Sequence, residues 1–219
     1  MVETPEIEQA KSQFQAESAA TMLAQIWEWL ENVCDPEVPV LSVLDLGVVR
    51  SITIQYDGME ITSHFDSRNT NQSQIPQDPP STVHRLSSAS PINIQQSTFN
   101  IKITPTYTGC PAMSMIAANI KLELLSHGLE KVSVIEVLSP AWTTDWMSES
   151  GRQKLLDYGI APPQAKARID KMLFSDTPVP CPLCGSENTE RISEFGSTAC
   201  KSLHRCLDCR EPFDSFKCH

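Results

Sequence analysis

Four of the eight cysteines in this chain of 219 residues form two Cys-x-x-Cys pairs. The pairs are Cys181 with Cys184 and Cys206 with Cys209. Each pair lets two sulfurs reach one ion, and two pairs complete a tetrahedral zinc site. The segment 179–219 carries few large apolar side chains, so a metal is the expected source of its folding free energy. The spacing therefore predicts a zinc ribbon with Zn²⁺ in a structural role. A four-thiolate iron site and a catalytic dithiol are the alternatives.

Two more cysteines near the ribbon, Cys200 and Cys218, have no partner in this pattern, and His204 and His219 lie nearby. One interpretation is that both cysteines pack inside or beside the ribbon. The alternative is a second metal site. Basic and acidic residues nearly balance between 181 and 219, whereas a ribbon that binds nucleic acid is usually basic. This balance favours a protein partner.

A further cysteine, Cys110, lies between a predicted strand at 99–103 and a predicted helix at 112–127. Pro111 suits the first helical position, because the N–H that proline lacks would be unpaired there. Cys110 would then face unpaired backbone N–H groups and the positive end of the helix dipole. That setting lowers the pKa of a thiol and favours the thiolate, which is both a nucleophile and a metal ligand. The alternative is a small apolar side chain within the core.

Hydrophobic periodicity predicts an α+β fold with a small mixed three-stranded sheet and packed helices. Asp57-Gly58 is a strong hairpin signal. The strand that returns from this hairpin is expected to be interrupted by a polar insertion and to resume near Phe99. We expect helices at 17–33, 112–127, 148–158 and 164–173, and strands at 48–56, 59–62, 99–103 and 131–138.

Composition divides the chain into segments. Residues 1–16 are polar without a clear period, so we expect a disordered tail. The main domain is expected at 17–140, and within it the segment 63–98 is rich in Ser, Thr, Asn, Gln and Pro, which indicates an exposed insertion. A helical connector at 141–178 leads to the ribbon at 179–219.

The net charge limits the classes of partner. The chain carries a formal charge of −10 and has a pI near 4.9. This argues against binding to nucleic acid or to anionic membranes, both of which need an excess of Lys and Arg. No apolar run approaches the length of a membrane span, and the first residues are acidic rather than those of a signal peptide. We expect a cytoplasmic protein.

Longer motifs point to a family. The segments 35–50 and 104–113 resemble the MIP-type (SUF-associated) iron–sulfur assembly domain. Four other segments narrow the resemblance to the PaaD (PaaJ) family of small subunits associated with phenylacetyl-CoA epoxidase; they are 142–147, 159–163, 195–201 and 211–218.

The resemblance implies an accessory subunit rather than an enzyme. It would act in the ring-epoxidation step of aerobic phenylacetate catabolism, with the oxygenase and reductase subunits of the epoxidase as partners; a homodimer stays open. Its role would be to mature or deliver an iron or iron–sulfur centre, with Fe or a cluster held only transiently. The functional residues of the related domains map onto Cys110 and Asp35, with Glu37 and Asp45 as weaker candidates.

Two other functions stay open. The chain could be a thiol enzyme with Cys110 as nucleophile, although no histidine lies in a context that marks it as the activating base. It could also be a passive structural scaffold. The sequence has neither the Glu-x-x-His pairs of a diiron bundle nor the Gly-x-Gly-x-x-Gly of a dinucleotide site. Both absences agree with placing the oxygen chemistry in other subunits.

Overall fold

The computed structural model describes residues 5–65, 94–163 and 178–217, with side chains described from residue 18 onward. Residues 66–93 of the expected insertion and the helix expected at 164–173 lie outside the described residues. The elements, in chain order, are α1 (Pro5–Leu30), β1 (Val49–Tyr56), β2 (Met59–His64), β3 (Thr98–Ile103), α2 (Met113–Ser126), β4 (Val132–Glu136), the 3-10 helix η2 (Thr144–Trp146), α3 (Glu149–Asp157), β5 (Ile160–Ala161), β6 (Thr189–Ser193), β7 (Lys201–Cys206) and β8 (Pro212–Phe216).

The main sheet has the order β2-β1-β3-β4, with β3 and β4 parallel and the other pairs antiparallel. The α+β class is confirmed, but the sheet has four strands rather than three. The reason is visible at Ile54, which pairs with Ile61 of β2 on one side and with Phe99 of β3 on the other. The segments before and after the insertion are therefore separate strands on opposite sides of β1.

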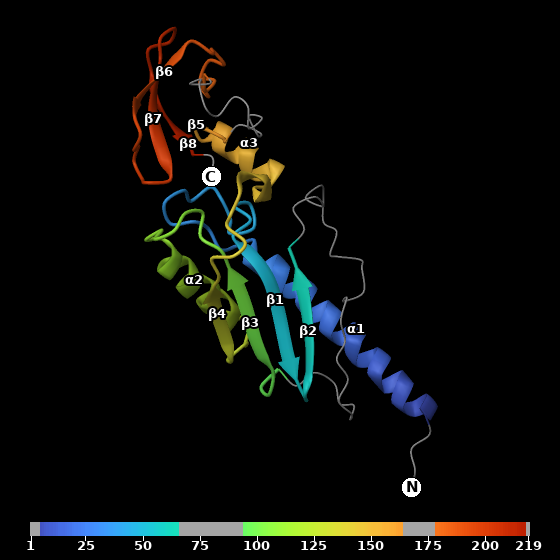
Figure 1. The fold of residues 1–219 in the computed structure, drawn as a ribbon. Helices are drawn as coiled ribbons and strands as arrows, with labels where there is room; N and C mark the ends of the chain where they lie inside the picture. The colour runs from blue at the N-terminus through green and yellow to red at the C-terminus, as the bar shows by residue number, and fades with distance from the viewer. Residues whose placement is uncertain (1–4, 66–93, 164–177, 218–219) are drawn as a thin grey trace.

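Both long helices lie against the same face of this sheet (Figure 1). Alternate strand residues point to that face, which is why Ile52, Ile54, Ile101 and Ile103 are all buried. Burying a side chain of this size stabilises the fold by about 1.5–3 kcal/mol. The helices contribute buried residues at spacings of three and four; they are Leu23, Ile26 and Leu30 from α1, and Met113, Ile116, Ile120 and Leu124 from α2.

The first helix starts earlier than expected. It runs from Pro5, whereas the sequence predicts a disordered tail over residues 1–16. No helix among the described residues is long and apolar enough to cross a membrane.

The second sheet has the order β5-β8-β7-β6 and forms the ribbon. Its core is small and consists of Ala161, Cys181, Cys206 and Phe213, with Val179 packed against it. Strand β5 comes from the expected connector and pairs in parallel with β8. The ribbon sheet is therefore completed by residues that precede 179.

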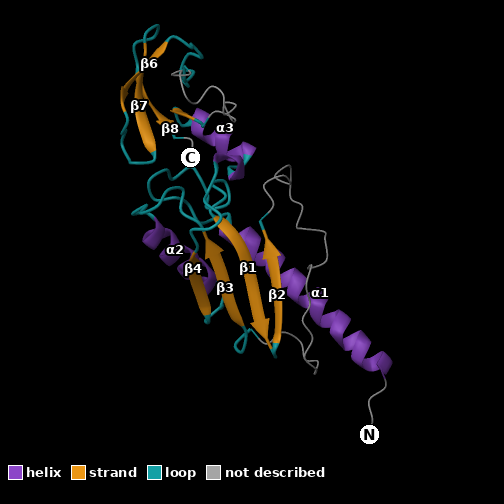
Figure 2. Cartoon of the chain, in the orientation of Figure 1, coloured by secondary structure: helices purple, strands orange, loops and turns teal. Residues whose placement is uncertain are grey.

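The ribbon packs against the end of the main sheet. Loops gather between the two sheets in Figure 2. Cys200 and Phe216 are ribbon residues, yet both belong to the core of the main domain. The ring of Phe216 lies 6.2 Å from that of Trp142, whose Nε1 donates to the Leu46 carbonyl at 2.8 Å. Through Trp142, these contacts bring the loop after α1 next to the ribbon.

Candidate metal centre and thiol site

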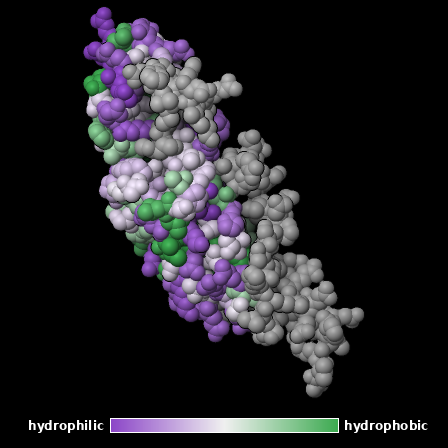
Figure 3. Space-filling model, in the orientation of Figure 1, coloured by the Kyte–Doolittle hydropathy of each residue, from purple (hydrophilic) through white to green (hydrophobic). Residues whose placement is uncertain are grey.

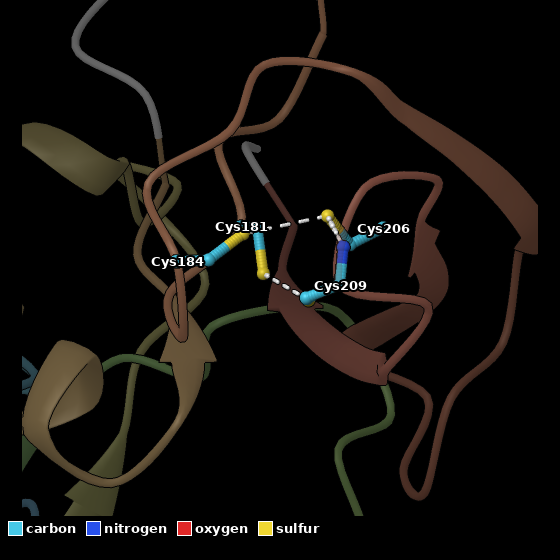
Figure 4. Close-up of side chains that lie close together, drawn as sticks. All are labelled: Cys181, Cys184, Cys206 and Cys209. Carbon is cyan, nitrogen blue, oxygen red and sulfur yellow. Dashed lines mark hydrogen bonds between the residues drawn. The ribbon is translucent and has the colours of Figure 1, made fainter.

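The structure brings the four predicted ribbon ligands together. The Sγ atoms of Cys181 and Cys209 are 3.8 Å apart, those of Cys184 and Cys206 are 3.6 Å apart, and all four lie within 4.8 Å of one another (Figure 4). Zinc–sulfur bonds of about 2.3 Å in a tetrahedron give sulfur–sulfur distances of about 3.8 Å. The donor set and its spacing therefore fit a tetrahedral metal ion.

Hydrogen bonds hold the two Cys-x-x-Cys turns in place. Asp208 accepts from Ser186 Oγ at 2.5 Å and from Asn188 Nδ2 at 2.8 Å, which ties one turn to the other. The backbone N–H of Cys209 points at the Cys206 sulfur, 3.5 Å away. Together with the Asp208 N–H it outweighs burial and lowers the pKa of Cys206 to about 6. Burial and the other three sulfurs raise the pKa of Cys209 to about 12. The four thiols therefore titrate together as one group, and a bound cation would favour loss of their protons.

The second candidate site surrounds Cys110. Helix α2 begins at Met113 with Ala112 as its N-cap, so Cys110 lies in the turn before the helix and Pro111 is not its first residue. The thiol is half-buried. Burial raises the pKa of Cys110, and the charges of Glu37 and Asp35 raise it further. Hydrogen bonds with the Ala112 N–H and with Tyr107 lower it, but by less. The lowering by the Ala112 N–H is the one expected for the start of a helix, but burial and the nearby carboxylates outweigh it, so the expected net lowering is wrong.

The two acidic candidates play different parts. Asp35 is only 8% exposed, and its Oδ1 accepts from the backbone N–H groups of Glu37 and Val38, both at 2.8 Å. Burial raises the pKa of Asp35 despite these bonds. Asp35 thus shapes the Asp-Pro-Glu loop, as Asx turns do. Glu37 is half-exposed, and its carboxylate faces the thiols. Asp45 lies elsewhere, bonded to Ser148 and Lys154 beside α3.

The sequence did not identify two residues of this cluster. Cys200 comes from the ribbon, and its Sγ lies 3.7 Å from Glu37 Oε2 and 3.0 Å from Thr198 Oγ1. Tyr107 interacts with the Cys110 thiol; burial, followed by the charges of Cys110, Glu37 and Cys200, raises the pKa of Tyr107 to about 12. The sequence had marked Cys200 as a cysteine outside the Cys-x-x-Cys pattern, with a second metal site as one alternative. Both residues lie in segments that carry the family resemblance, 104–113 and 195–201, but nothing in the sequence placed them together.

A hollow of about 410 Å³ opens beside Cys110. Its walls come from the end of β3, the turn before α2, the first half of α2 and strand β4. The lining residues besides Cys110 are Ile103, Gly109, Pro111, Met113, Ser114, Ala117, Val134 and Glu136. Figure 3 shows apolar surface over α2 and β4, where Met115, Ile135 and Leu138 are exposed. The thiol is therefore reachable from solvent on this side.

Sequence comparison relates most of this chain to a known protein and its C-terminal part to a family model. Residues 165–217 match the PaaD zinc beta ribbon domain. The chain is 37% identical over 200 residues to an Escherichia coli (strain K12) protein whose name makes it a subunit of 1,2-phenylacetyl-CoA epoxidase, and the match covers 91% of this chain and 95% of that protein. The crystal structure of a domain of unknown function, DUF59, from Bacillus anthracis is 21% identical, with a TM-score of 0.38 over 62% of this chain and 92% of that one.

Proposed function

Since the chain belongs to the PaaD family of phenylacetyl-CoA epoxidase subunits, we propose that it is the accessory subunit that matures or delivers the iron or iron–sulfur centre of the epoxidase. The oxygenase and reductase subunits would be its partners, in the cytoplasm. Iron or a cluster would be cargo, held transiently at Cys110. The ribbon would carry a resident zinc ion with a structural role.

The observation that carries the proposal is the surroundings of Cys110. Its thiol is half-buried, next to the Glu37 carboxylate, and is reached through an open hollow. Sulfur and oxygen donors together suit iron. A cation would favour loss of the thiol proton, whereas the neighbouring carboxylates on their own disfavour it.

The same surroundings count against a thiol enzyme. An activated cysteine needs a lowered pKa or an adjacent base, but the pKa of Cys110 is raised. Two of the described histidines make contacts away from Cys110. His127 stacks on Trp29, and His204 contacts Ser202. Among the described residues, no histidine appears among the groups that act on Cys110.

Zinc is the proposed resident ion because four thiolates at tetrahedral spacing suit it, and because the ribbon core is too small to fold unaided. The four-thiolate set holds iron with the same geometry. Elemental analysis of protein expressed with both metals in excess separates the two readings.

The test uses a strain that lacks this gene and carries either the wild type, Cys110→Ser or Cys34→Ser at matched soluble levels. Cys34 is an exposed thiol and serves as the matched control. We expect the epoxidase complex from Cys110→Ser cells to contain less iron or sulfide per oxygenase, while Cys34→Ser matches the wild type. Full metal loading of the epoxidase with Cys110→Ser would contradict delivery and leave a scaffold role.

A further inference from the structure

The ribbon places Cys200 inside the main domain. Cys200 is only 5% exposed and belongs to the core of that domain, although it directly precedes strand β7 of the ribbon. Its carbonyl accepts from the Lys217 N–H at 2.9 Å, which joins it to the end of β8. The position of its thiol therefore depends on the folded ribbon.

The spacing between Cys200 and Glu37 is that of two ligands on one ion. Their Sγ and Oε2 atoms are 3.7 Å apart, between the 3.6 and 3.8 Å of the ribbon sulfur pairs. Metal–sulfur bonds of about 2.3 Å and metal–oxygen bonds of about 2.1 Å give about 3.6 Å along the edge of a tetrahedron. A metal ion can therefore replace the thiol proton between these two atoms with little movement of either.

The charges around this pair favour a cation. The Glu37 and Asp35 carboxylates both raise the pKa of Cys200, and Lys201 acts in the opposite direction. Lys201 also lies 3.9 Å from Asp214, so its charge is shared. Burial and the carboxylates raise the pKa of Cys200 to about 11, although the Thr198 hydrogen bond and the Lys201 charge lower it. A divalent cation would reverse this balance, with the thiol proton released to solvent.

Cys110 interacts with the same neighbouring groups as Cys200. Glu37 acts on both thiols, and Tyr107 interacts with both. The three ligand atoms are not grouped as closely as the ribbon sulfurs, so binding has to draw Cys110 inward. The adjoining Gly109 has a φ of +85° and open space around the position of a Cβ, which leaves this turn room to move.

From these observations we infer that Cys200 of the ribbon, Glu37 and Cys110 form a second metal site, which takes one thiophilic divalent cation such as Fe²⁺ between the two folded units. The inference rests on the proposed function in taking iron as the cargo. It goes further in making the ribbon a donor of a ligand, not only a zinc-stabilised module. Two thiols and one carboxylate leave a coordination position through which a recipient can take the ion.

The test adds Co²⁺ anaerobically to the zinc-loaded full chain and follows thiolate-to-cobalt charge-transfer absorption, with zinc content measured before and after. We expect the wild type to bind about one Co²⁺ while keeping its zinc. Cys200→Ser and Cys110→Ser should each weaken Co²⁺ binding at least about tenfold and reduce the charge-transfer intensity. Cys34→Ser, which removes an exposed thiol, should match the wild type.

A further variant protects the test against misfolding. Glu37→Gln keeps the size of the side chain and both cysteines, so it should keep zinc but weaken Co²⁺ binding. Wild-type Co²⁺ affinity in Cys200→Ser, or the absence of any Co²⁺ bound beyond displaced zinc, overturns the inference. If Cys110→Ser leaves the epoxidase short of iron but Cys200→Ser does not, the proposed function stands and the ribbon ligand alone is rejected.

Discussion

The Cys200 Sγ lies 3.7 Å from the Glu37 Oε2, although 163 positions separate the two residues. One belongs to the ribbon and the other to the loop after α1, so this contact joins the two folded units at the thiol site. Removing or unfolding the ribbon would therefore alter the surroundings of Cys110 as well as the ribbon itself.

Loss of zinc should unfold the ribbon. Metal affinity supplies the folding free energy of a segment whose buried core is this small. We expect Cys184→Ser, or chelation of the wild type, to abolish the β6–β8 sheet, as measured by amide hydrogen exchange. The environment of Trp142 should change too, because its ring lies beside Phe216. Full exchange protection of the ribbon in metal-free protein would show that the ion is dispensable.

Asp45 should make stability fall in acid. Burial alone would raise its pKa, but Lys154 Nζ at 2.6 Å, the Ser42 N–H and the Ser148 hydroxyl hold the pKa of Asp45 below its usual value. A lowered folded-state pKa gives stability that is present above the unfolded value of 3.8 and is lost as pH falls through the folded value. We expect Asp45→Asn to cost about 2 kcal/mol at neutral pH.

The measurement is denaturant unfolding across acidic pH. Asp45→Asn should have a shallower loss of stability below about pH 4 than the wild type. Asp57→Asn is the matched control, because Asp57 lies in the exposed β1–β2 turn and Asn tolerates its positive φ. Equal acid slopes for the wild type and Asp45→Asn would refute the assignment.

A side chain at position 47 should displace the loop that contains η2. Gly47 has a φ of +65°, and a Cβ there would lie 2.1 Å from the Trp146 carbonyl oxygen. Gly128 has a φ of +83° but nothing within 4 Å of such a Cβ. Gly128→Ala should therefore cost only the backbone strain, about 1–2 kcal/mol. Gly47→Ala should cost at least about 3 kcal/mol, since a clash adds to the strain. If Gly47→Ala and Gly128→Ala lose equal stability in thermal unfolding, the Trp146 backbone moves aside at no cost and the predicted clash is wrong.

Cys110 should react slowly with alkylating reagents at neutral pH. Its pKa is raised from 9.0 by burial and by Glu37 and Asp35, so little thiolate is present. Peptide mass spectrometry after brief iodoacetamide treatment should show Cys34, which is exposed, modified first. The rate at Cys110 should still be rising above pH 9.0. Faster alkylation of Cys110 than of Cys34 at neutral pH would revive the thiol-enzyme alternative.

Much of the local structure followed from the sequence. The β1–β2 hairpin follows from Asp57-Gly58, because both residues adopt positive φ in the turn. The buried stripe of α2 follows from its three- and four-residue spacing. The grouping of the four ribbon cysteines follows from the paired Cys-x-x-Cys turns. Each of these signals lies within a few neighbouring residues.

The pairing of the strands and the chemistry of the thiol site depend on contacts between residues that are far apart in the sequence. The sequence alone could not show that β3 pairs with the far side of β1, because strand pairing across an insertion depends on which edge is free. It predicted a lowered pKa for Cys110, whereas the folded chain raises it through burial and two carboxylates. The α+β class, the hairpin and the four-cysteine ribbon could be predicted because each depends on spacing between neighbouring residues. The contact between Cys200 and Glu37 could not, because it forms only when the ribbon packs against the main domain.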